Sequence, residues 1–251
     1  MSGIEAPAVP EIRSTFRPSF YLWIILVMCF LVFTGFGMTY WIPLATATFP
    51  PAPPIVHIHG LVFFGWMVLL AVQSTLVNSS KVAWHRSLGT FGIAHATVIM
   101  YTGALIQLMG LRRAIASGAT GPFDTAYIAL NAVIGFGFLF TLAIRNVRRP
   151  EAHKRLMLFA TLPIIPPGVN RFYQVPFGLE YIPVLPLYLT LNALALAILI
   201  HEWRNTGKIG RYSMIGAGYV LLQALLHVPV VQSETFTQGV YYVVENLVLY
   251  R

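Results

Sequence analysis

Histidine is the residue type in this sequence best suited to chemistry, because imidazole binds haem iron, zinc and copper. The seven histidines sort into two layers along the long apolar segments. The layer at the basic ends of the segments consists of His85, His153 and His201, with His95 deeper in the same segment as His85. The layer at the opposite ends consists of His57, His59 and His227. The pattern thus offers one candidate metal centre in each layer.

The basic-end layer suits a b-type haem, which needs two imidazoles at matched depth on neighbouring helices. His85 and His153 meet this requirement, since each opens an apolar segment from the same side. Each is followed by cations that would pair with haem propionates, Arg86 after His85 and Lys154 and Arg155 after His153. The alternative interpretation of these "HR" and "HKR" motifs is that they are cations bound to lipid headgroups.

The segment that follows His85 has small residues on one face and an ionisable group at depth. Gly89 and Gly92, one and two turns beyond His85, would line the face of a porphyrin. His95 lies roughly 12 Å below the membrane boundary, given a helical rise of about 1.5 Å per residue. Ionisable groups at such depth are costly and face a partner or a cavity, so His95 is assigned to the same site.

The opposite layer is the candidate for a metal-dependent enzyme site, with His57, His59 and His227 as ligands. Two features argue against it, because no Asp or Glu lies inside the apolar segments and no HxxxH spacing occurs. His57 and His59 are two residues apart, so on a regular helix they point some 200° apart. Only an unwound segment start after the preceding prolines would bring them together.

Three further side chains are expected to face the interior of a helical bundle. Trp66 and Gln73 follow His59 at intervals of seven residues, near one face of the same helix. Arg171 follows a predicted helix break at Pro166–Pro167, at a depth where a charge needs a partner. The partners expected for Arg171 are Glu180, Asn170 or an anionic ligand.

Composition predicts the elements that carry these residues. Of the 251 residues, 57% are hydrophobic and only 10% are charged, and the mean hydropathy is +0.72. Soluble domains have about 25% charged residues, so the sequence predicts an all-α integral membrane bundle. The net charge of +8 does not indicate nucleic acid, because the cations lie between apolar runs as in cytoplasmic loops. The single Cys29 excludes a disulfide framework and a thiolate metal site.

Seven membrane-spanning segments are expected within a bundle that covers residues 20–232. They are expected at residues 20–44, 60–77, 87–109, 125–144, 156–175, 182–200 and 215–231. The sequence before them, residues 1–19, is interpreted as a cytoplasmic segment rather than a signal peptide. The sequence after them, residues 233–251, would lie on the outer face and form a short amphipathic helix from Gln238 to Tyr250.

Basic residues predict the orientation of the bundle. Twelve of the 16 Lys and Arg residues fall on one side of the segments, which predicts an inner N-terminus and an outer C-terminus. These twelve are Arg13, Arg17, Lys81, Arg86, Arg145, Arg148, Arg149, Lys154, Arg155, Arg204, Lys208 and Arg211. The remaining four are Arg112, Arg113, Arg171 and Arg251.

The order of the motifs "HIHG", "WHRSLG", "EAHKRLM" and "NR" resembles an uncharacterised family of bacterial membrane proteins over residues 55–172. More distantly, the layout is similar to two-haem transmembrane b-type cytochromes that reduce ferric iron or accept electrons from ascorbate. In that family four consecutive helices each begin with a histidine. His59, His85 and His153 match three of these positions, and no histidine opens the 125–144 segment. The resemblance implies a bacterial inner membrane and haem b ligation by His85 and His153.

Three functions are expected from these patterns. The first is a membrane redox protein that binds b-type haem and passes electrons between a quinone or a small reductant and a partner. The second is a cofactor-free accessory subunit that packs against a larger membrane complex, which the aromatic content of 14% favours. The third is a metal-dependent membrane enzyme that uses the opposite-layer histidines. The sequence does not decide whether the protein is an enzyme.

Overall fold

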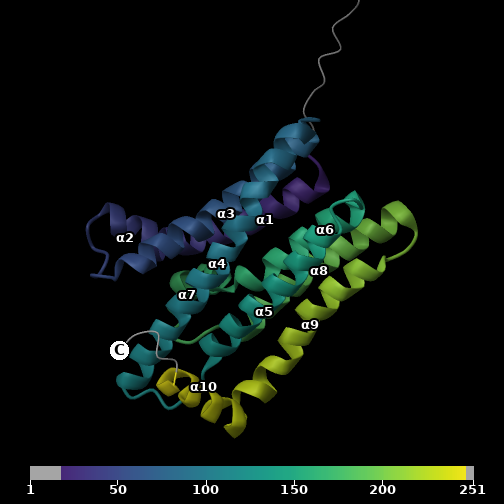
Figure 1. The fold of residues 1–251 in the computed structure, drawn as a ribbon. Coiled ribbons are helices and arrows are strands. Elements are labelled where there is room, and N and C mark those ends of the chain that lie inside the picture. Colours follow the sequence, from purple (N-terminus) through teal and green to yellow (C-terminus); the bar gives the residue numbers. More distant parts are fainter. Residues whose placement is uncertain (1–17, 247–251) are drawn as a thin grey trace, which may run out of the picture.

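A computed structural model describes residues 18–246, and every regular element in that range is a helix (Figure 1). The all-α class expected from composition is confirmed. The helices are α1 Phe20–Phe36, η1 Gly37–Trp41, α2 Ile42–Ala45, α3 Pro54–Asn78, α4 Val82–Ala116, α5 Asp124–Arg145, α6 Pro150–Thr161, η2 Leu162–Ile164, α7 Pro166–Phe177, α8 Val184–Thr206, α9 Arg211–Val231 and α10 Glu234–Asn246. Arg13, Arg17 and Arg251, which were counted in predicting the orientation, lie outside the described residues.

Within the described residues, six stretches of helix are long and apolar enough to cross a membrane. They are residues Phe20–Ala45, which join α1, η1 and α2, and the helices α3, α4, α5, α8 and α9. α4 has 35 residues, so it is longer than the expected 87–109 segment at both ends. The expected helix at 238–250 corresponds to α10, which begins earlier, at Glu234; residues 247–251 lie outside the described range.

The expected fifth segment is divided into α6, η2 and α7. Pro163 lies in η2, and Pro166 and Pro167 begin α7. Proline lacks a backbone N–H and its ring clashes with the preceding turn, so one continuous helix cannot form here. The break expected from the sequence is therefore present.

α3 is a regular helix from its first residue. Pro54 occupies the first helical position, where the missing N–H removes no hydrogen bond. His57 and His59 consequently lie within the helix, on different faces. The unwound start that would have brought the two imidazoles together is absent from this region.

The helices associate mainly as hairpins. α3 packs on α4, α5 on α6, and α8 on α9, while α1 lies against α3 and α7 (Figure 1). At the α1–α7 contact, a Cβ on Gly35 would overlap the carbonyl of Gly168, so both positions need glycine for this close approach. Trp66 and Phe136 are among the largest fully buried side chains, and they make an edge-to-face contact in the core.

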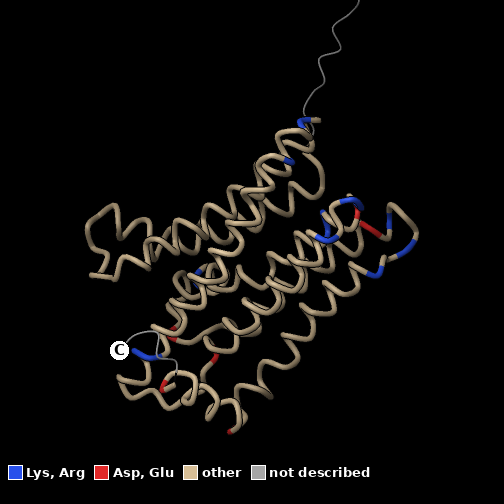
Figure 2. The backbone as a smooth tube through the Cα atoms, in the orientation of Figure 1, with Lys and Arg blue, Asp and Glu red and all other residues tan. Residues whose placement is uncertain are grey.

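Charged residues gather at one end of the bundle. Figure 2 shows Lys and Arg at the α3–α4, α5–α6 and α8–α9 turns, which together form what we call the basic end. Few charges lie along the helices between the two ends. α10 lies at the opposite end, where Val240 packs with Leu111 of α4 and Phe123.

Candidate functional site

Two helical hairpins place His85 and His153 in equivalent positions. His85 is the fourth residue of α4 and His153 is the fourth residue of α6. The Nδ1 atom of His85 lies 3.4 Å from the carbonyl of Gln73 on α3, and that of His153 lies 2.9 Å from the carbonyl of Ala143 on α5. A carbonyl only accepts hydrogen bonds, so each Nδ1 donates and each Nε2 keeps its lone pair.

The two imidazole rings approach one another across the hairpins. Their centroids are 6.4 Å apart and their planes are inclined at 83°. An iron about 2 Å from each nitrogen, with each ring centre about 1.2 Å further away, would separate the centroids by about 6.4 Å. The centroid separation therefore matches that of two imidazoles bound to one iron.

The glycines expected to line the porphyrin instead face side chains of α3 at ordinary van der Waals distance. A Cβ on Gly89 would lie 3.6 Å from Nε2 of Gln73, and one on Gly92 would lie 3.5 Å from Cδ2 of Leu69. Gln73 thus lies beside the site, as its place on the bundle-facing side of α3 predicts. Its Oε1 atom is buried and has no hydrogen-bond partner in the described chain.

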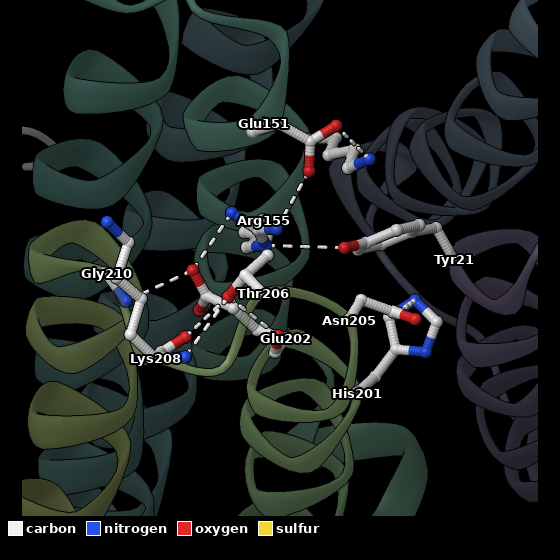
Figure 3. A network of polar contacts seen from close by, with 10 residues as sticks. Tyr21, Glu151, Arg155, His201, Glu202, Asn205, Thr206, Lys208 and Gly210 are labelled. Carbon is white, nitrogen blue, oxygen red and sulfur yellow. Dashed lines mark hydrogen bonds and ion pairs between the residues drawn. The ribbon is translucent and has the colours of Figure 1, made fainter.

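The cations that follow the two histidines have different surroundings. Arg86 is exposed at the basic end, so it is accessible to an anionic group. Arg155 is buried, and its guanidinium contacts Glu202 at 3.0 Å and Glu151 at 2.8 Å (Figure 3). Its Nε also donates to the hydroxyl of Tyr21. These contacts give Arg155 a structural role in place of the expected propionate contact.

Glu202 is the centre of this buried network. Its side chain is 4% exposed, and Oε1 accepts hydrogen bonds from Arg155 and from the backbone N–H of Gly210 (Figure 3). The network therefore ties α6, α8 and the start of α9 together beside His153. Sequence reasoning did not identify Glu202, because its partner lies far away in the chain.

His59 and His95 both pack inside the α3–α4 hairpin. Nε2 of His95 donates to the carbonyl of Val62 at 2.7 Å, and its ring stacks with Trp66. Nδ1 of His59 lies 3.0 Å from the hydroxyl of Thr102. His95 therefore has a partner, as its depth predicts, but that partner belongs to α3 and not to the His85–His153 site.

The proposed ligands at the opposite end have separate partners. Nδ1 of His57 bonds to the hydroxyl of Tyr40 at 2.9 Å. His227, which is 1% exposed, lies between Asp124 at 2.7 Å and the hydroxyl of Tyr188 at 2.8 Å. Within residues 18–246, no group of three His, Cys, Asp or Glu residues could hold a metal ion. The structure thus does not bring His57, His59 and His227 together.

Asp124, which pairs with the buried His227, was not among the residues singled out from the sequence. It begins α5, where the helix dipole alone accounts for a carboxylate, so its position in the sequence gives no indication that it pairs with His227.

Arg171 also differs from expectation in its partners. It donates to the carbonyl of Pro167 at 2.8 Å and lies 4.5 Å above the ring of Phe36, and it forms no ion pair with another described residue.

No protein-family model, curated protein or solved structure matches the chain. The class of this protein is therefore described from its fold and its side-chain contacts alone. Residues 18–246 form an all-helical protein with six membrane-length apolar stretches and two histidines, His85 and His153, whose rings lie 6.4 Å apart near its basic end.

Proposed function

We propose that this protein is a multi-pass redox protein of the bacterial cytoplasmic membrane that binds one b-type haem between His85 and His153. It would pass electrons between a quinone or a small reductant and a partner. The single observation that carries the proposal is the 6.4 Å separation of two nearly perpendicular imidazoles whose Nδ1 atoms are both held by carbonyls. A juxtamembrane cation bound to lipid headgroups needs no such pairing.

The residues around the pair orient the ligands in this proposal. The carbonyls of Gln73 and Ala143 favour the Nδ1–H tautomer of both histidines, which leaves each Nε2 available as the ligand atom. The haem supplies reversible one-electron transfer when it is bound. Arg86 is available to pair with a propionate, whereas the buried Arg155–Glu202 pair fixes the helix that carries His153.

The proposed topology has seven crossings, with the N-terminus inside and the C-terminus outside. The broken α6–η2–α7 segment provides the seventh crossing in addition to the six long apolar stretches. The break in this segment is buried, since Leu162 and Pro163 of η2 and Ile165 after it are all buried, which is the setting in which a broken crossing is tolerated. The basic end then lies in the cytoplasm, in accordance with the positive-inside rule.

The test is the visible spectrum of the purified full-length chain, expressed with ample haem and compared before and after reduction with dithionite. We expect a Soret band that shifts on reduction, about one haem per chain by pyridine haemochrome assay, and a low-spin spectrum. Perpendicular imidazole planes leave the iron dπ orbitals close in energy, so electron paramagnetic resonance of the oxidised protein should show one large g value.

His85→Ala and His153→Ala should each abolish the low-spin spectrum. His201→Ala is the matched control at the same end of the bundle, because His201 stacks on Phe20 and bonds to Asn205 instead. If both site variants keep the wild-type spectrum, His85 and His153 are not the ligands. A featureless spectrum from wild-type protein would reject haem binding and support the cofactor-free accessory subunit.

A further inference from the structure

Two arginines at the basic end converge on one phenol oxygen. Arg149, from the α5–α6 turn, donates to the hydroxyl of Tyr212 at 3.3 Å, and Arg211 donates to the same oxygen at 3.1 Å. The Arg211 guanidinium also lies 4.8 Å from the ring of Tyr212. We call these three residues the Arg149–Arg211–Tyr212 cluster.

No carboxylate within residues 18–246 pairs with the cluster to balance its charge. None of the ion pairs formed by residues 18–246 includes Arg149 or Arg211. The two nearby acids are already used, because Glu151 pairs with Lys154 and Arg155, and Glu202 pairs with Arg155. Two guanidiniums held by one neutral oxygen repel each other, and an anion between them would convert this repulsion into attraction.

Both arginines also lie where a helix already carries positive potential. Arg149 is the N-cap residue of α6, whose first turn contains Glu151, already paired with Lys154 and Arg155, and Arg211 is the first residue of α9, whose first turn contains no acid. Helix N-termini present free N–H groups and a positive dipole end, which favours anions and disfavours cations. The Tyr212 hydroxyl accepts from both arginines, so its own hydrogen remains available for an anionic oxygen.

We propose that the Arg149–Arg211–Tyr212 cluster binds the phosphate of an anionic phospholipid headgroup. The position of the cluster favours lipid over a soluble phosphate, because it lies at the first residues of a membrane-length apolar helix. Met214 and Ile215 follow within one turn, and their exposed side chains would contact acyl chains. Basic sites at the cytoplasmic ends of membrane helices have the chemistry that such headgroups require. The proposal does not depend on haem binding.

The test measures phosphatidylglycerol binding to the detergent-purified full-length chain by native mass spectrometry. The double variant R149Q/R211Q should bind about thirty-fold more weakly, from about 1 kcal/mol for the hydrogen bond to phosphate that each arginine loses. The matched control R204Q/K208Q removes two charges from the same end and leaves the cluster intact, so its affinity should fall less than about fivefold. Tyr212→Phe keeps both charges and should bind about fivefold more weakly, through loss of one hydrogen bond.

Competition separates the two sources of phosphate. Inorganic phosphate and zwitterionic phosphatidylcholine should fail to displace phosphatidylglycerol. Displacement by inorganic phosphate would overturn the lipid assignment in favour of a soluble phosphate ligand. Equal losses of phosphatidylglycerol affinity in R149Q/R211Q and R204Q/K208Q would overturn the proposed site, because lipid binding would then depend only on the net charge of the protein. Should R149Q/R211Q fail to fold, unchanged binding by Tyr212→Phe would overturn the proposed geometry.

Discussion

Arg155 offers an internal comparison between a buried and an exposed ion pair. It contacts two carboxylates of the same chemistry, Glu202 at 3.0 Å and Glu151 at 2.8 Å. The Glu202 side chain is 4% exposed and the Glu151 side chain is 63% exposed. Glu202→Gln and Glu151→Gln each remove one negative charge and preserve the shape of the side chain. Each carboxylate also has one further partner, Lys154 for Glu151 and the Gly210 N–H for Glu202, so burial is the main difference between the two pairs.

Glu202→Gln should lower the free energy of unfolding several times more than Glu151→Gln does. Hydrogen bonds to charged groups contribute about 1.5–3 kcal/mol, so Glu202→Gln should lower the free energy of unfolding by about 2 kcal/mol. Glu202→Ala also deprives the Gly210 N–H of its acceptor, and breaking a buried pair costs about 3–5 kcal/mol. Glu151→Gln should cost about 0.5 kcal/mol, because solvent screens an exposed pair.

The assay is reversible unfolding in mixed micelles, followed by circular dichroism, with wild type and each variant at the same detergent composition. The Glu151→Gln/Glu202→Gln double variant should lose more than the sum of the single variants, because Arg155 then keeps no carboxylate. Equal costs for Glu151→Gln and Glu202→Gln would refute the reasoning that burial sets the strength of this network. A stabilised Glu202→Gln protein would show that desolvation of the charge outweighs its contacts.

Two further substitutions test the packing and the opposite end of the bundle. Gly35→Ala should lower the melting temperature in detergent by several degrees, because the added Cβ would overlap the carbonyl of Gly168. Gly37→Ala is the control and should leave the melting temperature unchanged, because no atom lies near the position of its added Cβ. Equal melting temperatures for the two variants would contradict the tight α1–α7 contact. His227→Leu leaves Asp124 and Tyr188 without their partner and should cost about 2–4 kcal/mol in the same unfolding assay, more than His57→Leu. A larger loss for His57→Leu would contradict the buried network.

The sequence alone determined the class of the protein and the places where helices form and break. A 57% hydrophobic chain with 10% charge has to bury its apolar stretches in a membrane or a bundle, whatever their partners. The break before α7 follows from the chemistry of proline at positions 163, 166 and 167, which acts within one helical turn. The bundle-facing positions of Trp66 and Gln73 follow in the same way from helical periodicity.

Only the tertiary structure decided which of these residues meet. The spacing of His85 and His153 in the sequence is compatible with a shared ligand or with two separate interfacial groups, and the hairpin packing places the rings 6.4 Å apart. His227 pairs with an acid 103 positions away, a separation at which a single sequence contains no signal of contact. Interactions within a helix can be predicted from residues near one another in the sequence, whereas contacts between helices depend on how all the helices pack together.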